Sequence, residues 1–127
     1  MPNSNFVVAV IDDDDVLREA LGTLLAALGY AIELYESGED FLAAVADTKA
    51  NCLLVDVHLD GICGIELGRG LARAGFNFPV IYMTASTDEM LRGRAMHSGC
   101  VAFLTKPFTP PALTEALSAA QRRAVSH

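Results

Sequence analysis

The stretch FVVAVIDDDDVLREALGTLLAALG, residues 6–29, joins an apolar run directly to four aspartates and then to a helical pattern. The run Phe6–Ile11 is apolar throughout, as in a parallel strand that is covered on both faces. Leucine and alanine then recur at helical spacing from Val16 onward, and Gly29 follows in a C-cap position. The stretch therefore predicts a buried strand, an acidic turn and an amphipathic helix.

Four further apolar runs follow the first, and helical patterns separate them. The runs are Ala31–Tyr35, Cys52–Val55, Val80–Met83 and Val101–Leu104. The later helices are expected from Ser37 as N-cap, over about Gly64–Ala74, over about Thr87–Ser98 and from about Pro110–Pro111 onward. Five strands with helix-length connections predict an α/β fold: a doubly wound, five-stranded parallel sheet in the order 2-1-3-4-5, with helices on both faces. We expect residues 1–127 to form a single domain.

The composition indicates a soluble, acidic protein. The net charge is −7 at pH 7 and the only lysines are Lys49 and Lys106. Binding nucleic acid requires clustered Lys and Arg, so we expect no direct binding of nucleic acid by this chain. No apolar stretch approaches the roughly 20 residues that span a bilayer. Three cysteines without framework spacing indicate reduced thiols. These features favour a cytoplasmic protein with no membrane partner.

Polar side chains follow the predicted strands at one end of the sheet. Asp12 and Asp13 follow the first strand, Asp56 ends the third, Thr84 ends the fourth and Lys106 follows the fifth. Because the carboxyl ends of parallel strands meet where such folds bind ligands, we expect these groups to converge. Two carboxylates about 4 Å apart repel by roughly 4 kcal/mol at an effective dielectric near 20, and one lysine cannot neutralise three of them. The sequence therefore predicts a bound hard cation such as Mg²⁺.

Asp14 and Asp15 have a simpler explanation. Carboxylates in the first turn of a helix accept hydrogen bonds from free N–H groups and interact favourably with the helix dipole. We therefore interpret one of these two residues as the N-cap of the first helix. The cysteines and histidines of the chain show none of the short paired spacings of zinc sites.

Four motifs in this order resemble the receiver domain of two-component response regulators. They are the pair Asp12-Asp13, Asp56 in LLVDVHLDGICG (53–64), Thr84-Ala85 in VIYMTA (80–85) and Lys106-Pro107 in FLTKPF (103–108). The resemblance extends from Val7 to about Ala120 and is greatest for receivers that precede a LuxR-type DNA-binding domain, as GYAIELYESGEDFL (29–42) indicates. It implies one receiver domain over residues 1–127 and no output domain in this chain.

The resemblance implies a role for each acidic residue of the strand ends. Asp56 is the expected phosphoacceptor, whose carboxylate attacks phosphorus and forms an acyl phosphate. Mg²⁺, or Mn²⁺ in its place, is expected to bind Asp13, Asp56 and the backbone carbonyl of His58. Asp12 is expected to hold the metal mainly through water.

The remaining roles that the resemblance implies concern the phosphoryl group and the switch. Thr84 and Lys106 are expected to bind the phosphoryl oxygens after transfer. Phosphorylation adds about −1.5 to −2 charge, which can draw the Thr84 hydroxyl inward. In the family an aromatic residue of the last strand then changes rotamer, and Phe103 is the matching residue. The output face would be the fourth helix, the fifth strand and the fifth helix. The Lys106-Pro107 bond is expected to be cis.

The function that the resemblance implies is a phosphoacceptor switch in a two-component phosphorelay. Such a domain is not an enzyme in the usual sense, although it assists its own phosphorylation and dephosphorylation. The implied phosphoryl donor is a sensor histidine kinase or a histidine phosphotransfer protein. A second copy of the chain is a further candidate partner.

Two other functions fit parts of the sequence. VAVIDDDDV (8–16) also resembles the first motif of haloacid-dehalogenase-type phosphatases, with Asp12 as the nucleophile and Asp14 as the general acid. That family needs an acidic pair beyond the lysine, where only Glu115 occurs, and it leaves Asp56 without a role. A constitutive interaction module is the second alternative, but a module of that kind gains nothing from a costly cluster of charges.

Overall fold

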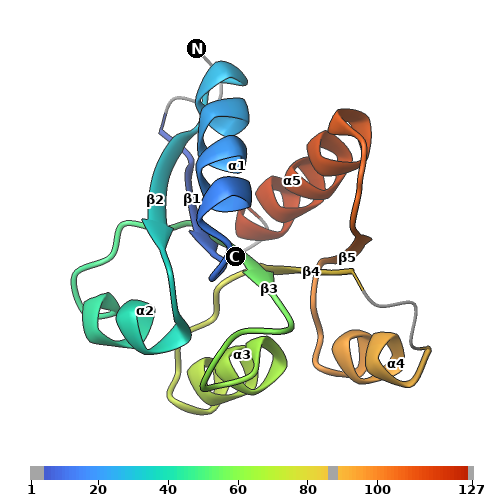
Figure 1. Ribbon diagram of the computed structural model, residues 1–127. Coiled ribbons are helices and arrows are strands. Elements are labelled where there is room, and N and C mark those ends of the chain that lie inside the picture. The colour runs from blue at the N-terminus through green and yellow to red at the C-terminus, as the bar shows by residue number, and fades with distance from the viewer. Residues whose placement is uncertain (1–4, 86–88, 126–127) are drawn as a thin grey trace.

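The computed structural model of the chain describes residues 5–85 and 89–125, in which strands and helices alternate. In chain order the elements are β1 (Val7–Ile11), α1 (Asp15–Ala27), β2 (Ala31–Tyr35), α2 (Gly38–Ala44), β3 (Cys52–Asp56), α3 (Gly64–Arg73), β4 (Val80–Thr84), α4 (Glu89–His97), β5 (Ala102–Thr105) and α5 (Pro110–Val125). The strands pair in parallel in the order β2-β1-β3-β4-β5 (Figure 1). The predicted fold class and strand order are therefore confirmed.

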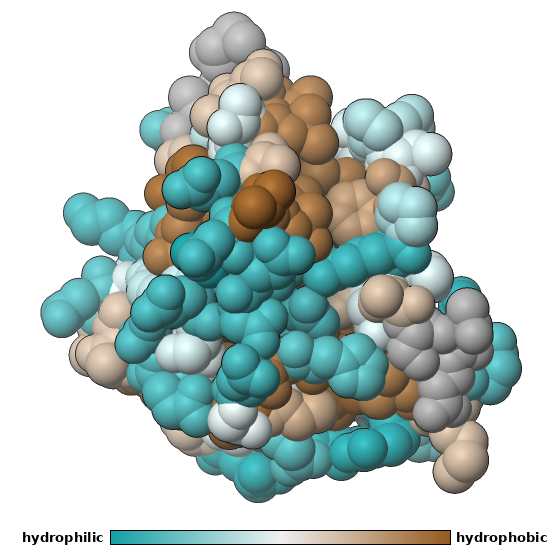
Figure 2. Space-filling model, viewed as in Figure 1, coloured by the Kyte–Doolittle hydropathy of each residue, from teal (hydrophilic) through white to brown (hydrophobic). Residues whose placement is uncertain are grey.

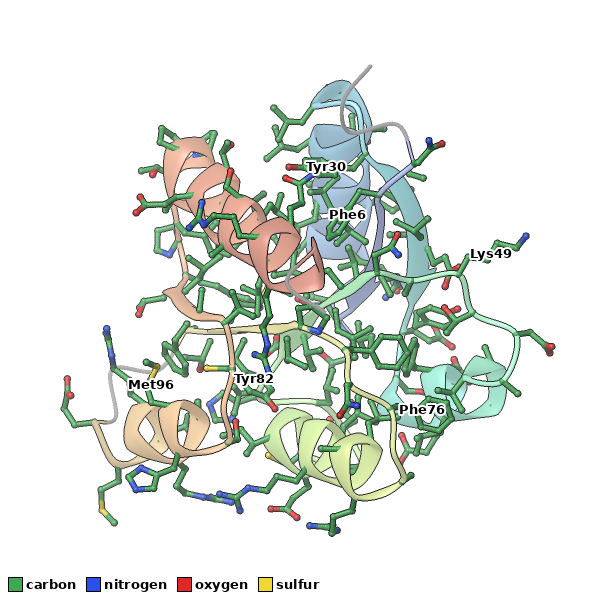
Figure 3. The ribbon with its side chains drawn as sticks, turned by 180° about the vertical axis from the view of Figure 1, so that it is seen from behind. Phe6, Tyr30, Lys49, Phe76, Tyr82 and Met96 are labelled. Atoms are coloured by element: carbon green, nitrogen blue, oxygen red, sulfur yellow. The ribbon has the colours of Figure 1, made fainter. Side chains whose placement is uncertain are left out.

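Two apolar layers cover the sheet, one on each face. Along β1, Val8 and Val10 belong to the layer under α1 and α5, whereas Ala9 and Ile11 belong to the layer over α2, α3 and α4 (Figure 1). Successive strand residues point to opposite faces, so both faces need apolar residues. This double burial explains why the strands are apolar throughout rather than alternating. At the rim of the first layer Phe6 and Tyr30 pack edge to face, with ring centroids 6.1 Å apart (Figure 3).

The ends of the first two helices follow the predicted caps. The Asp14 carboxylate accepts hydrogen bonds from the N–H groups of Val16 and Leu17, so Asp14 is the N-cap of α1. Ser37 Oγ accepts from the N–H of Asp40 at 3.0 Å and caps α2. Gly29 follows α1 with a φ of +96°, a conformation that glycine adopts without steric cost.

Several boundaries differ from the predicted ones by a residue or two. Phe6 and Val101 lie just outside β1 and β5. Asp56 and Thr84 end β3 and β4 as predicted, and the ladder includes them in the pairs Asp56–Met83 and Thr84–Thr105. The fourth helix ends at His97, and its predicted start at Thr87 lies outside the described residues. The Lys106-Pro107 bond is cis, as expected. In the part of the chain that the structure describes, no helix combines the length and the apolar character needed to cross a bilayer.

Candidate functional site

The carboxyl ends of β1, β3 and β5 place three charged side chains together. Asp12 follows β1 and is fully buried, Asp56 is the last residue of β3 and is 7% exposed, and Lys106 follows β5. The backbone around them continues the ladder, since the N–H of Asp12 donates to Tyr35 O at 3.1 Å and that of Lys106 to Thr84 O at 2.7 Å. The hydrogen bonds of the sheet therefore fix the backbone positions from which these side chains extend. Figure 2 shows hydrophilic residues gathered across the middle of this face.

Lys106 joins two of the acidic residues. Its Nζ lies 2.7 Å from Asp56 Oδ2 and 3.2 Å from Asp12 Oδ2. Burial raises the pKa of Asp12. The hydrogen bond from the Asp14 N–H and the charge of Lys106 lower it, but the effect of burial is larger. Burial alone would lower the pKa of Lys106, but the hydrogen bond and charge of Asp56, with the charge of Asp12, raise it. Lys106 is therefore held as a cation between the two carboxylates.

A third carboxylate makes the cluster a fit for a hard cation. One oxygen each of Asp12, Asp13 and Asp56 lies within 4.8 Å of the other two. Asp13 Oδ2 also accepts from the N–H of Asp60 at 3.1 Å, and Asp56 Oδ1 accepts from the N–H of His58 at 2.8 Å. All the side-chain atoms that could bind a metal here are carboxylate oxygens, which Mg²⁺ prefers as ligands. A divalent ion would also offset the negative charge of the three carboxylates that Lys106 alone leaves unbalanced. The residues present therefore fit a magnesium site.

The remaining predicted residues lie at or near the same edge. Thr84 is fully buried at the end of β4, and its carbonyl accepts from the Lys106 N–H. Phe103 lies further back on β5, opposite Tyr82 in the strand register, and packs into the layer over α2, α3 and α4. The Arg92 guanidinium of α4 lies 5.7 Å from the centre of its ring. His58 contacts the cluster through its N–H group, and the predicted role of its carbonyl stays a prediction.

Gly64 is required where α3 begins beside the site. A Cβ at this position would overlap the carbonyl oxygen of Asp56 and would lie 3.0 Å from Val55 Cγ1. The close approach lets the Gly64 N–H donate to Val57 O at 3.0 Å. Glycine therefore allows α3 to start directly against the strand that carries Asp56.

Sequence reasoning missed Arg18. This α1 residue donates from Nη1 to the backbone oxygen of Asp12 at 2.7 Å and from Nη2 to Asp15 Oδ1. Its side chain is only 14% exposed. The sole signal in the sequence is the three-residue spacing from Asp15, which is ordinary on a helix surface.

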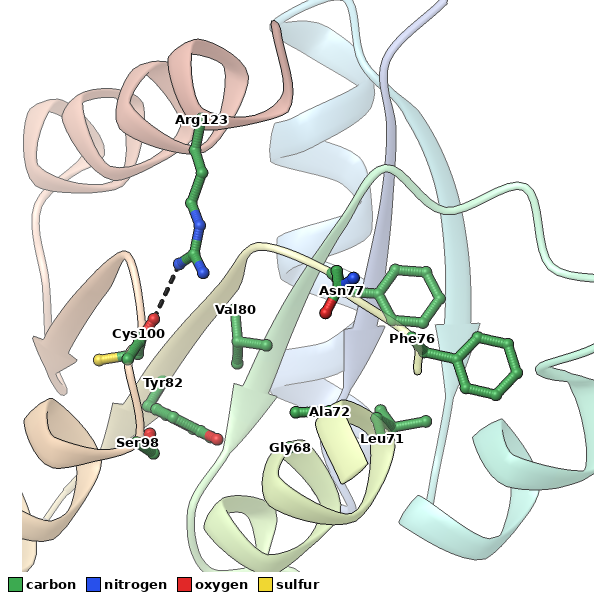
Figure 4. A pocket seen from close by; sticks show the side chains of 12 residues that line it. Gly68, Leu71, Ala72, Phe76, Asn77, Val80, Tyr82, Ser98, Cys100 and Arg123 are labelled. Carbon is green, nitrogen blue, oxygen red and sulfur yellow. Dashed lines mark hydrogen bonds between the residues drawn. The ribbon is translucent and has the colours of Figure 1, made fainter. Parts of the chain in front are cut away.

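A cavity of about 60 Å³ lies away from the acidic cluster. It is lined by residues of α3, β4, the α4–β5 connection and α5, among them Tyr82 and Arg123, and by none of the acidic cluster (Figure 4). Arg123 donates to the carbonyl of Gly99 at 2.8 Å across one side of it. The cavity is therefore separate from the site at the strand ends.

Known proteins share both the sequence and the fold. The family model of the response regulator receiver domain matches residues 8–118. The transcriptional regulatory protein FixJ of Azorhizobium caulinodans is 40% identical over 123 residues, which are 97% of this chain and 58% of that protein. FixJ of Rhizobium meliloti is 31% identical over 97% of this chain and 60% of its own length. This chain thus spans about three-fifths of the length of these curated relatives.

Solved structures agree with these relatives. The crystal structure of full-length FixJ from B. japonicum superposes with a TM-score of 0.89 and 34% identity, covering 96% of this chain and 60% of that one. The crystal structure of FixJ-N superposes with a TM-score of 0.86 and 32% identity, covering 92% and 94%. The matched residues 8–118 include all of the sheet except Val7, and with it the strand ends that carry the acidic cluster.

Proposed function

This chain belongs to the response regulator receiver family, and we propose that Asp56 is the residue that accepts its phosphoryl group. Receiver domains are phosphoacceptor switches of two-component signalling, and this chain is a signalling domain of that kind, not an enzyme in the usual sense. The observation that carries the assignment is the position of Asp56, 2.7 Å from Lys106 Nζ and beside two further carboxylates. The proposed nucleophile, a cation and the proposed metal ligands thus lie together at one end of the sheet.

In the proposed reaction a carboxylate oxygen of Asp56 attacks phosphorus. The new O–P bond forms as the bond from phosphorus to the donor breaks, and the donor leaves with that electron pair. Charge spreads over the equatorial phosphoryl oxygens in the transition state. Lys106 and the Thr84 hydroxyl would bind those oxygens. In support, Lys106 Nζ already contacts Asp56 Oδ2, and the His58 N–H holds Asp56 Oδ1.

Mg²⁺ is the proposed cofactor, and Mn²⁺ would serve in its place. Asp13 and Asp56, with the His58 carbonyl, would hold it directly, and Asp12 would hold it mainly through water. When bound, the ion supplies positive charge that the carboxylates and the phosphoryl oxygens share. Lys106 then becomes available to the phosphoryl group.

The proposed donor is a sensor histidine kinase or a histidine phosphotransfer protein, with which receiver domains interact. The groups that stabilise phosphoryl charge during transfer act equally when water attacks the acyl phosphate. We therefore expect the chain to assist its own dephosphorylation as well. A second copy of the chain remains a proposed partner.

The alternative as a phosphatase with Asp12 as nucleophile is disfavoured by the burial of Asp12. Both Asp12 and Asp56 accept a backbone hydrogen bond and pair with Lys106, but Asp12 is fully buried whereas Asp56 is 7% exposed. The alternative would need the less accessible carboxylate to attack the substrate, and it leaves Asp56 without a role. A constitutive interaction module is the remaining alternative, and it predicts that no phosphoryl group is transferred to Asp56.

The proposed switch transmits the new charge toward α4. An acyl phosphate on Asp56 would draw the Thr84 hydroxyl inward, and Phe103 would turn into the space that becomes available. The output face would then be α4, β5 and α5. Phosphorylation should therefore change hydrogen exchange in Glu89–His97 more than in α1, and a uniform change, or none in α4, would contradict this part of the proposal.

Incubation with acetyl phosphate and Mg²⁺, followed by intact-protein mass spectrometry, tests the acceptor. The wild-type chain should gain the mass of one phosphoryl group, and Asp56→Asn should not. Asp47→Asn is the matched control, because Asp47 is an exposed acid in the turn after α2. Equal labelling of wild type and Asp56→Asn would assign the acceptor to another residue.

A further inference from the structure

The Arg18 side chain extends from α1 back toward the end of β1. Its guanidinium donates to Asp12 O at 2.7 Å and to the carboxylate of Asp15. We infer that Arg18 is a positioning residue for the magnesium ligands, acting through the backbone between Asp12 and Asp13. The inference rests on the proposed function, because it concerns the metal of that same site.

The peptide plane explains how a contact to Asp12 O can aim Asp13. The carbonyl of residue 12 and the N–H of residue 13 belong to one rigid planar unit, so fixing the carbonyl direction fixes the start of Asp13. Asp12 is already held by its N–H to Tyr35 O and by its side-chain oxygens. For Asp13 the structure gives one side-chain contact, from the Asp60 N–H. Arg18 thus constrains the ligand that the sheet holds least.

Apart from its i,i+3 ion pair with Asp15, Arg18 lies at a position that is unfavourable for the helix itself. Its N–H makes the first backbone bond of α1, to Asp14 O at 2.9 Å, so its charge lies at the amino-terminal end. A cation there opposes the helix dipole. The placement is explained by what the guanidinium contacts: a buried carbonyl and one of the four consecutive carboxylates.

Arginine suits this task better than lysine. The planar guanidinium presents two N–H donors at a fixed angle, so one side chain can hold Asp12 O and Asp15 Oδ1 at once. A lysine would keep the charge but would place a single point donor between the two acceptors. The geometry of the fork, and not the charge alone, is what positions the backbone.

Charge and positioning predict opposite effects on metal binding. A cation near the cluster repels Mg²⁺, so removing only a charge would tighten binding. Removing a positioning contact loosens binding, and groups that orient metal ligands are typically worth 10–100-fold in affinity. The sign of the change therefore distinguishes the two roles.

The experiment is calorimetric titration of the full chain with Mg²⁺ alone, for wild type, Arg18→Gln, Arg18→Lys and Arg73→Gln. Arg73 is an exposed arginine in the last turn of α3, so it controls for the loss of one positive charge. We expect Arg18→Gln to raise the Kd for Mg²⁺ by about tenfold and Arg73→Gln to leave it unchanged or slightly lower. Arg18→Lys should recover only part of the affinity.

A second measurement uses acetyl phosphate labelling at increasing Mg²⁺. Saturating Mg²⁺ should restore most of the labelling rate of Arg18→Gln, because the substitution affects metal binding and not the phosphoryl contacts. Urea unfolding without metal establishes whether the variants are folded. If Arg18→Gln does not fold, the Mg²⁺ affinity of Arg18→Lys is compared with that of wild type instead. Unchanged or tighter Mg²⁺ binding by Arg18→Gln, or full recovery by Arg18→Lys, would overturn the inference alone. A wild-type chain that binds no Mg²⁺ would overturn it together with the proposed metal site.

Discussion

Replacing Asp13 with Asn should stabilise the chain when no divalent cation is present. The carboxylate oxygens of Asp12, Asp13 and Asp56 lie within 4.8 Å of one another. At that separation two unit charges repel by about 3.5 kcal/mol at an effective dielectric of 20 and by about 0.9 kcal/mol in bulk water. Asn keeps an acceptor oxygen for the Asp60 N–H, so the substitution removes charge while it preserves the contact.

The magnitude follows from the exposure of Asp13. It is the most exposed of the three acids, so solvent screens its two repulsions toward the lower value. We expect the free energy of unfolding to rise by about 2 kcal/mol. With an m-value of about 2 kcal/mol/M, the urea midpoint would rise by about 1 M. In the wild type, Mg²⁺ at 100 times its Kd should add about 2.7 kcal/mol, and Asp13→Asn should lose most of this gain.

Urea unfolding followed by circular dichroism, with EDTA or with saturating Mg²⁺, measures both effects. Asp47→Asn is the matched control, since it removes one exposed carboxylate outside the cluster and should change neither midpoint by much. The reasoning is refuted if Asp13→Asn is less stable than wild type in EDTA. It is also refuted if Mg²⁺ stabilises Asp13→Asn as much as it stabilises the wild type.

Three further substitutions test the contacts around the sheet. Gly64→Ala should lower the free energy of unfolding by about 1–3 kcal/mol, and with it the urea midpoint, because its Cβ would overlap Asp56 O; it should also slow acetyl phosphate labelling. Gly68→Ala should destabilise the wild type but be nearly neutral in Tyr82→Phe, because the added Cβ meets the Tyr82 hydroxyl; equal costs in both backgrounds would exclude that contact. Burial alone would raise the pKa of Glu33, but three hydrogen bonds lower it below 4.5. The stability that Glu33 contributes should therefore be present above pH 4.5 and be lost as the pH falls through the lowered pKa, so the difference between wild type and Glu33→Gln in urea should shrink in acid.

The fold and most of the site could be predicted because buried parallel strands exclude polar groups. Apolar runs such as Phe6–Ile11 are covered on both faces, so a polar residue that ends a run marks the strand end. Asp12, Asp56 and Lys106 were identified in this way, and the structure brings them into contact. The boundary errors arose at strand starts, where Phe6 and Val101 extend the apolar run beyond the ladder and no apolar pattern can indicate where pairing begins.

Contacts that depend on side-chain direction could not be predicted. Glu33 lies in the middle of β2, where its carboxylate accepts from the Tyr35 hydroxyl, Thr48 Oγ1 and the Lys49 N–H. Neither Thr48 nor Lys49 belongs to a periodic pattern, so the sequence gives no sign of this network. The fit of the Tyr82 hydroxyl against Gly68 is similar, because it joins a strand to a helix across the layer.

Two cations reach the acidic site from different elements, and they differ in what they hold. Lys106 comes from the end of β5 and pairs with the side chains of Asp12 and Asp56. Arg18 comes from α1 and holds the backbone oxygen of Asp12. A phosphoryl group on Asp56 would compete for Lys106, because it offers new anionic oxygens where Lys106 Nζ already binds. It leaves the contact between Arg18 and the Asp12 carbonyl in place. Under the proposed function, Lys106 therefore changes partners during signalling while Arg18 keeps its own, and this difference allows the metal ligands to stay aligned in both states.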